Sequence, residues 1–489
     1  MHDEPLIFER GSAGRMAWPV PPALGGDGAP LPAELSREDD LAGLPEVSEL
    51  EVLRHFVRLS QWNYSPATTF YPLGSCTMKY NPVVNEAVAR LPWFAGLHPL
   101  VPDTLAQGAL EVLAGLEGAL AALCGLDAVS LQPAAGAHGE LLGMLLVRAY
   151  HVDRGNARRR VLIPSTAHGT NPASAALCGY TVTEVPVDAR GLLPASAVAA
   201  AMDGSVAALM VTNPNTLGLF EQEIEAVAAV VHSHGGLVYM DGANMNAIMG
   251  VARPGDMGVD VMQFNLHKTF STPHGGGGPG AGPVAVRAPL AEYLPVPRLV
   301  RRGTLLGWSE EFPKSVGRMR SFFGNFGILL RAFAYISSLG GPGLTEATRL
   351  AVLNANYLRA RLRGTYHLPY ATPSLHECVF SDRNLQEHDV HTLDVAKRLL
   401  DYGFYAPTIY FPLVVKGALM IEPTETETRE TLDEFVSALL AIAEEARTEP
   451  ALVRGAPHRT RLARLDETRA ARRPVLRWRP SVGDPAPES

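Results

Sequence analysis

A lysine that follows an apolar segment is the residue best suited to covalent chemistry in this sequence. Lys268 comes after VDVMQFN and stands among Phe264, Leu266 and Phe270. Apolar neighbours penalise the ammonium form of a lysine and favour the neutral amine, which can condense with an aldehyde. A lone lysine in such a setting is more often a side chain with a buried stem and a charge in water. The reactive interpretation of Lys268 therefore depends on the groups around it.

An aspartate placed before this lysine could serve the same chemistry. Asp241 ends the apolar segment LVYMD. Pyridoxal phosphate accepts electrons when its ring nitrogen is protonated, and a carboxylate beside that nitrogen holds the proton. The alternative is that Asp241 caps a helix or bonds the backbone two residues on, which is a frequent use of aspartate at strand ends.

Two segments of small residues could let backbone approach a ligand. LQPAAGAHGE turns through residues 134–137, where the N–H groups of Gly136 and Ala137 could hold a phosphate at the start of a helix. A tight turn without a ligand would have the same composition. The glycine tract at 275–278 also permits close approach, but its spacing matches neither a dinucleotide-binding motif nor a P-loop.

Three more polar residues come after apolar, strand-like segments. His168 follows RRVLIP and could stack on a pyridine ring, although a single histidine is normally structural. Thr212, Asn213 and Asn215 follow VAALMV, and an amide there could bond the cofactor's phenolic oxygen. Five predicted strand ends thus carry the parts that a pyridoxal phosphate site requires.

The elements that must position these residues alternate between strand and helix. Between residues 128 and 288, short apolar segments alternate with helical patterns, which predicts an α/β fold with a mainly parallel sheet. Functional residues of such sheets gather at the carboxyl ends of the strands. The predicted division is an extended N-terminal arm over 1–65, a large cofactor-binding α/β domain over 66–325, a smaller α+β domain over 326–450 and a basic tail over 451–489.

Composition narrows the class of protein. The chain has 489 residues, 47% of them apolar and 19% charged, and a formal net charge of -8. This balance gives no reason to expect a nucleic acid or a membrane as partner. The four cysteines form no CxxC pair, which argues against a zinc site and a disulfide framework. We expect a cytoplasmic protein without a metal.

Seven segments between Phe70 and Glu427 match one known family in order and sequence. They are FYPLGSCTMKYNP, LQPAAGAHGE, AHGTNPASA, TNPNTLGLFE, MDGANMNA, FNLHKTFSTPHGGGGPGAGP and MIEPTETE. The chain resembles the P-protein family of the glycine cleavage system, specifically the second subunit of its two-subunit form. The resemblance implies the aspartate-aminotransferase-like, type I fold of pyridoxal phosphate enzymes.

The resemblance also implies roles for the residues identified above. Lys268 would hold pyridoxal 5'-phosphate as a Schiff base, Asp241 would face the ring nitrogen and His168 would stack on the ring. The phosphate contacts that it implies are Gly136, Ala137, Asn265 and Thr269.

The implied reaction is decarboxylation of glycine with transfer of the aminomethyl group to the lipoyl arm of H-protein. The implied partners are H-protein and a first subunit, in a heterotetramer of two of each. Two alternatives stay open at this point. One is another reaction of the same cofactor, transamination or hydroxymethyl transfer, and the other is a scaffold without catalysis.

A polar segment, PLGSCTMKYNP, has no assigned role. Ser75, Thr77 and Lys79 could contact the cofactor phosphate or a neighbouring subunit. Cys76 could exchange with the lipoyl sulfurs, although a small buried side chain is the commoner role of a cysteine. Arg383 is one candidate among several for the partner of the glycine carboxylate.

Overall fold

The computed structural model describes residues 4–18, 32–35, 44–275 and 280–477. The chain divides into two units, one of Pro66–His458 and one that combines Met1–Ser65 with Arg459–Ser489. Parts of the predicted arm, of the glycine tract and of the basic tail lie outside the described residues. The predicted boundaries at 65, 325 and 450 stay predictions.

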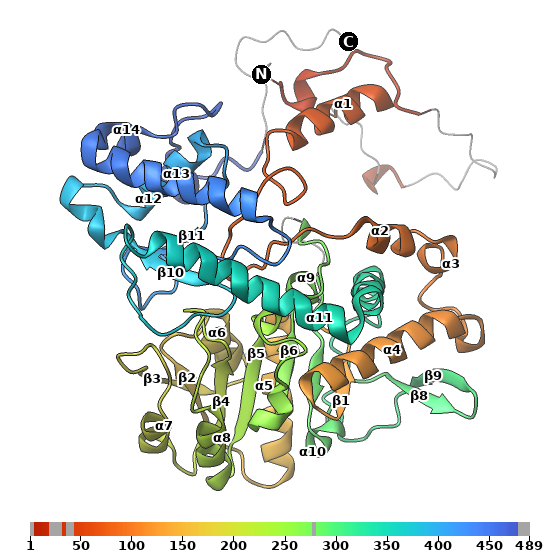
Figure 1. The fold of residues 1–489 in the computed structure, drawn as a ribbon. Helices are drawn as coiled ribbons and strands as arrows, with labels where there is room; N and C mark the ends of the chain where they lie inside the picture. Colours follow the sequence, from red (N-terminus) through yellow and green to blue (C-terminus); the bar gives the residue numbers. More distant parts are fainter. Residues whose placement is uncertain (1–3, 19–31, 36–43, 276–279, 478–489) are drawn as a thin grey trace. The chain divides into compact units, whose positions relative to one another are not determined.

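A seven-stranded sheet lies at the centre of the larger unit (Figure 1). Its strands are β1 (Ala128–Ser130), β2 (Arg160–Pro164), β3 (Thr181–Val185), β4 (Val206–Thr212), β5 (Leu237–Gly242), β6 (Val261–Phe264) and β7 (Val284–Val286), in the order β1-β7-β6-β5-β4-β2-β3. β3, β2, β4, β5 and β6 pair in parallel, whereas β7 runs antiparallel to its neighbours β1 and β6. The predicted mainly parallel sheet is confirmed.

Helices cover the sheet and bury it on both faces. They include α4 (Gln107–Cys124), α5 (Gly136–Asp153), α6 (Thr170–Leu177), α7 (Ala195–Ala201), α8 (Ile224–Ser233), α9 (Leu266–Thr269) and α10 (Ala288–Ala291). Along β5 the side chains alternate between the two cores, since Met240 packs with Leu116 and Leu120 of α4, while Tyr239 packs with Leu142 of α5. Burial on both faces explains why the strands read as continuous apolar segments.

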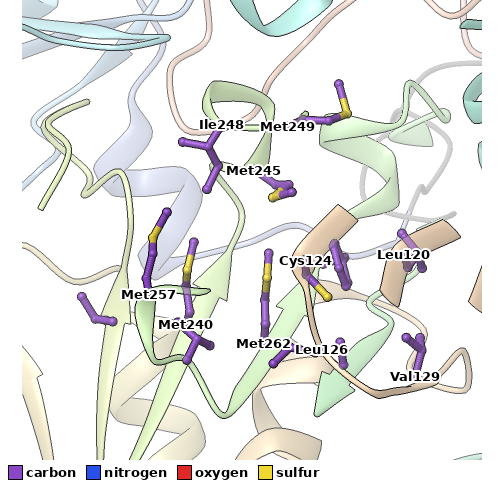
Figure 2. Close-up of a cluster of buried hydrophobic side chains, with 14 of the residues drawn as sticks. Leu120, Cys124, Leu126, Val129, Met240, Met245, Ile248, Met249, Met257 and Met262 are labelled. Atoms are coloured by element: carbon purple, nitrogen blue, oxygen red, sulfur yellow. The ribbon is translucent and has the colours of Figure 1, made fainter. Parts of the chain in front are cut away.

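The core beneath the functional strand ends is rich in methionine. Figure 2 shows Met240 and Met262 beside Met245, Met257 and Cys124, and all of these belong to one buried cluster. Unbranched thioethers fill irregular spaces between a twisted sheet and its helices. This cluster fixes β5 and β6, the strands that carry Asp241 and lead to Lys268.

Among the described helices, α4 alone is long and apolar enough to cross a membrane. Its residues Leu113, Leu116 and Leu120 are buried in the core of the protein. The apolar character of α4 is therefore explained by packing within the larger unit.

A long helix connects this sheet to a second, smaller core. α11 (Phe326–Leu362) is kinked at Gly340, whose φ of 59° and ψ of 180° are not helical, just before Pro342. Ala347 packs with the core of the large sheet, whereas Leu358 packs with the smaller core. The predicted boundary near residue 326 falls at the start of α11, a helix that contributes side chains to the core of the large sheet and to the smaller core.

The smaller core contains a three-stranded antiparallel sheet in the order β10-β12-β11. Its elements are β10 (Cys378–Ser381), β11 (Thr408–Ile409), β12 (Ala418–Ile421), α12 (Thr392–Asp401), α13 (Arg429–Thr448) and α14 (Pro450–Gly455). The larger unit also has α2 (Val83–Ala89), α3 (Pro92–Ala95), the hairpin β8 (Arg298–Arg302) and β9 (Leu305–Ser309), and short 3₁₀ helices at Asp103–Leu105, Met245–Ala247, Pro254–Met257, Asp382–Asn384 and Gln386–His388. Strands and helices thus occur where the sequence predicts a smaller α+β region.

The other unit is organised around α1 (Glu49–Ser60), which begins with a capping box between Ser48 and Glu51. Glu4 is buried and accepts hydrogen bonds from His55 at 2.9 Å and from Arg58 at 3.0 Å. This unit also has 3₁₀ helices at Ile7–Glu9 and Ala33–Leu35 and the helix α15 (Glu467–Arg472).

Candidate active site

Lys268 lies in the single turn of α9 that follows β6, and its side chain is partly buried. Its charge perturbs the pKa values of side chains from several separate segments. They are Cys76, Glu140, His168, His267, His274, His376, Glu377 and Glu422. Lys268 therefore lies in a polar site that the carboxyl end of the large sheet and the edge of the smaller sheet build together.

Asp241 is the penultimate residue of β5 and is almost fully buried. Its Oδ1 accepts from Gln263 Nε2 at 2.5 Å and from the Ala243 N–H at 2.9 Å, while its Oδ2 accepts from Asn171 Nδ2 at 3.2 Å. The bond from Ala243 is the backbone contact named above as the alternative role of this aspartate. The other two bonds hold the carboxylate in one orientation, so Asp241 has both a structural contact and a fixed acceptor.

His168 follows β2, and the charges of both Lys268 and Asp241 act on its ring. Burial first, and the charge of Lys268 second, lower the pKa of His168 below its usual value, and the Asp241 carboxylate opposes the shift. The ring is therefore neutral at physiological pH. Its Nδ1 lies 2.9 Å from the Thr170 hydroxyl and 3.2 Å from the Thr170 backbone nitrogen, so Thr170 fixes the orientation of the ring. The structure thus brings Lys268, Asp241 and His168 within electrostatic reach of one another.

The four predicted phosphate contacts lie at two neighbouring turns. α5 begins at Gly136 without a side-chain cap, and the first N–H groups of a helix have no intrahelical acceptor. A Cβ at Gly136 would stand 2.0 Å from Asn265 Oδ1, so this turn lies directly against Asn265. Thr269 is fully buried, and its hydroxyl has no hydrogen bond partner among the described residues. Uncapped N–H groups, which include that of Ala137, and a free buried hydroxyl suit a phosphate group.

Gly136→Ala tests this contact. The added methyl would collide with Asn265 Oδ1, so we expect a loss of about 1–3 kcal/mol in the free energy of unfolding of the cofactor-free protein, together with weaker cofactor binding. Urea titration and cofactor titration by absorbance measure the two effects. Gly118→Ala is the control, because a Cβ at that helical position meets nothing within 4 Å. Cofactor affinity equal to wild type in Gly136→Ala would remove Gly136 from the site.

The structure does not support the predicted contact of Asn213. Its Oδ1 accepts from the Glu221 N–H at 3.0 Å, and its Nδ2 lies 4.0 Å from Met257 Sδ. Asn215 is also engaged, since its Nδ2 donates to Gly191 O at 2.9 Å and to Glu221 Oε1 at 2.8 Å. The chain folds back on itself after β4, and the side-chain amides of Asn213 and Asn215 form hydrogen bonds that hold this loop. Thr212 of β4 is in register with Asp241 of β5. Its hydroxyl group is buried and has no hydrogen bond partner among the described residues.

The polar segment from Ser75 to Lys79 packs against the site, and its described contacts are with other residues of this chain. Lys79 is buried, and its Nζ donates to Glu425 Oε1 at 2.7 Å and to Asn246 Oδ1 at 2.9 Å. These bonds occupy the amine that the sequence suggested for the cofactor phosphate. Burial raises the pKa of the Cys76 thiol although Lys268 opposes the shift, which disfavours the reactive thiolate.

Arg383 lies away from this group of residues. It is exposed in the 3₁₀ helix Asp382–Asn384. Burial first, and the charge of Arg383 second, lower the pKa of His367. Its suggested bond to the glycine carboxylate has no support in the geometry.

Several residues of the site were not predicted from the sequence. They are Gln263 and Asn171, which hold Asp241, Glu140 near it, and His376, Glu377 and Glu422 from the smaller sheet. Burial, first, and Asp241, second, raise the pKa of Glu140 to about 8. The available signal was a charged residue directly beside an apolar strand, as in HECVF and LMIEP, but the sequence does not show which way it points.

Comparison with known proteins agrees with this geometry. The family model described as glycine cleavage system P-protein matches residues 28–309, and that of the glycine dehydrogenase C-terminal domain matches residues 347–456. A relative from Caldanaerobacter subterraneus subsp. tengcongensis, named probable glycine dehydrogenase (decarboxylating) subunit 2, is 52% identical over 97% of this chain and 98% of its own. A relative of the same name from Chlorobium chlorochromatii is 53% identical over 96% of this chain and 98% of its own.

Solved structures show the same fold. A crystal structure of glycine decarboxylase (P-protein) in inhibitor-bound form superposes with a TM-score of 0.71 at 23% identity, over 84% of this chain and 92% of that one. An aspartate aminotransferase from Thermus thermophilus gives a TM-score of 0.57 at 17% identity, over 77% and 99%. The predicted aspartate-aminotransferase-like fold is confirmed.

Proposed function

The chain belongs to the P-protein family of the glycine cleavage system, and from that premise we propose which of its residues act and which partners it needs. It is a pyridoxal phosphate enzyme that decarboxylates glycine. The observation that supports the residue assignment is the position of His168 and Lys268 after β2 and β6 and of Asp241 at the end of β5, close enough for both charges to act on the His168 ring.

Each of these residues has a distinct task. The Lys268 amine is the group that bonds the cofactor aldehyde, and the neutral His168 ring covers the pyridine face. The Asp241 carboxylate, which Gln263 and Asn171 orient, holds a proton at the ring nitrogen. Gly136, Ala137, Asn265 and Thr269 hold the phosphate. When bound, pyridoxal phosphate supplies an acceptor for the electrons of the bond that glycine loses with carbon dioxide.

The partners follow from the family. The relatives are named subunit 2, and a first subunit is the implied companion of this chain. We propose a heterotetramer of two of each subunit, located in the cytoplasm. The acceptor of the aminomethyl group is lipoylated H-protein.

Exchange of isotope tests the activity. Glycine labelled in its carboxyl group should exchange its label with bicarbonate when the first subunit and H-protein are added, because decarboxylation is reversible. The label is counted in glycine over time. Conversion of the label to glyoxylate that needed a keto acid, without exchange into bicarbonate, would assign a transaminase, and conversion of labelled glycine to serine would assign hydroxymethyl transfer.

A further inference from the structure

Two glutamates of the smaller sheet are buried side by side. Glu377 directly precedes β10 and Glu422 directly follows β12, and the register that pairs Cys378 with Ile421 places them as neighbours across the strands. Both are fully buried, and so is His376. The charge of Lys268 acts on all three side chains, so they belong to the site of the proposed function.

One oxygen of each glutamate holds the polar segment described above. Glu377 Oε2 accepts from the Ser75 N–H at 2.9 Å, and Glu422 Oε2 accepts from the Thr77 N–H at 2.9 Å. Ser75 and Thr77 have φ values of 64° and 48°, a left-handed conformation that these residues seldom adopt. The two carboxyl groups therefore stabilise a strained turn around Cys76.

The other two oxygens have no such bond. Glu377 Oε1 and Glu422 Oε1 each lie 3.9 Å from His376 Nε2, which is beyond hydrogen-bond distance. Within the described residues neither oxygen has a hydrogen bond partner, and neither ring nitrogen of His376 has one. Buried polar atoms without partners are rare and are typical of a group that exchanges protons or binds something.

The electrostatics of the pair favour a bound proton. Burial raises the pKa of Glu422 to about 7. Burial first, and the charge of Glu422 second, raise the pKa of Glu377 well above its ordinary value. Lys268 opposes the rise for both, and Lys79 opposes it for Glu422. Burial, first, and Lys268 lower the pKa of His376 to about 3, so this ring is neutral and supplies no counter-charge. Two carboxyl groups in such a setting share protons.

We propose that Glu377 and Glu422 are the proton store of this active site, which takes a proton from the glycine ammonium group and returns it to the leaving sulfur of the lipoyl acceptor. This inference rests on the proposed function, because it assigns a source and a destination to the proton. The pair holds one proton at rest and two after glycine has bound as the free amine.

The atoms and electrons balance in this sequence. Glycine loses one proton from its ammonium group as its nitrogen displaces that of Lys268 from the aldehyde carbon, and the Lys268 nitrogen bonds this carbon again when the aminomethyl group is released. When carbon dioxide leaves, the electron pair of the broken bond between Cα and the carboxyl carbon stays with the glycine Cα. This pair then forms the bond from Cα to one lipoyl sulfur. The sulfur–sulfur bond breaks, and the second sulfur leaves as a thiolate. That thiolate takes the stored proton, so the lipoyl disulfide is reduced while the glycine carbon is oxidised, without another reductant.

Glutamine variants separate a structural role of the pair from storage of a proton. Glu377→Gln and Glu422→Gln keep an oxygen that accepts from Ser75 or Thr77, and therefore keep the turn. A glutamine side chain cannot store a proton, so the double variant Glu377→Gln/Glu422→Gln has no titratable group left at this position. Glu221→Gln is the matched control, since Glu221 is buried, has its pKa raised to about 7 and accepts from the Leu193 N–H at 2.7 Å, but is not perturbed by Lys268.

Proton release on glycine binding tests the proposal. The cofactor-loaded assembly is mixed with glycine near neutral pH, without H-protein, in weakly buffered solution with a pH indicator. The Glu377→Gln/Glu422→Gln variant should release about one more proton per site than wild type or Glu221→Gln, because the pair can no longer retain it. Equal release from all three would overturn the proposal, whereas no change of the cofactor spectrum with glycine in wild type would overturn the proposed function itself.

Infrared spectroscopy of the cofactor-free wild type gives a second readout, which needs no variant to fold. A buried carboxylic acid band should be present at neutral pH and should disappear as the pH rises. Its absence at neutral pH would overturn the store. Stoichiometric binding of Zn²⁺ that Glu422→Gln abolishes would also overturn it, because the three side chains would then serve a metal.

Discussion

Lys268→Ala is expected to abolish both the covalent attachment of the cofactor and the exchange of glycine carboxyl label with bicarbonate. An alanine cannot bond the aldehyde, and Lys268 is the lysine of the turn that follows β6. Exchange should fall to the background rate of the assay, because the amine that bonds the cofactor aldehyde is lost and no catalysis by the bound cofactor can start. Borohydride reduction followed by mass spectrometry measures the attachment.

Two controls sharpen this prediction. Lys268→Arg keeps the positive charge but cannot form the link, so it should fail like alanine, which separates the amine from its charge. Lys314→Ala removes an exposed lysine that is paired with Asp153 and Glu292, and it should retain full attachment. Cofactor that is still fixed by borohydride in Lys268→Ala would place the covalent site on another lysine.

Asp241→Asn is expected to lower the exchange rate at least about 100-fold while the protein stays folded. The amide cannot hold a proton at the ring nitrogen, and misplacing a catalytic proton costs at least about this factor. The fold tolerates the change because the Asn171 side-chain amide, whose Nδ2 now donates to Asp241, can turn over and present its Oδ1, which has no partner among the described residues, to the new amide. The exchange rate and the spectrum of the bound cofactor are the measurements.

Asp260→Asn is the matched control for this prediction. Asp260 is also buried, but it precedes β6 and accepts from His232 and from the Val238 N–H, at the opposite end of the strands from Lys268. Its replacement should lower stability and leave the exchange rate per folded molecule near wild type. An Asp241→Asn enzyme as active as this control would show that Asp241 serves only its bond to Ala243.

The sequence alone was sufficient for the architecture and for the line of functional strand ends. Alternation of strand and helix patterns depends on local periodicity, and the parallel sheet follows from it. Asp241 lies at the carboxyl end of β5, and His168 and Lys268 come shortly after β2 and β6, so their common edge of the sheet could also be inferred. The motifs that resemble the P-protein family added the chemistry.

Side-chain direction and contacts between distant segments were decided only by the tertiary structure. Asn213 is at a strand end as expected, but the return of the loop turns its amide to Glu221. Glu377 and Glu422 are far apart in the sequence, and only the antiparallel pairing of β10 with β12 places them together against Ser75 and Thr77. Local periodicity fixes which face of an element a residue occupies, whereas the partner of a buried polar group depends on which remote segment packs there.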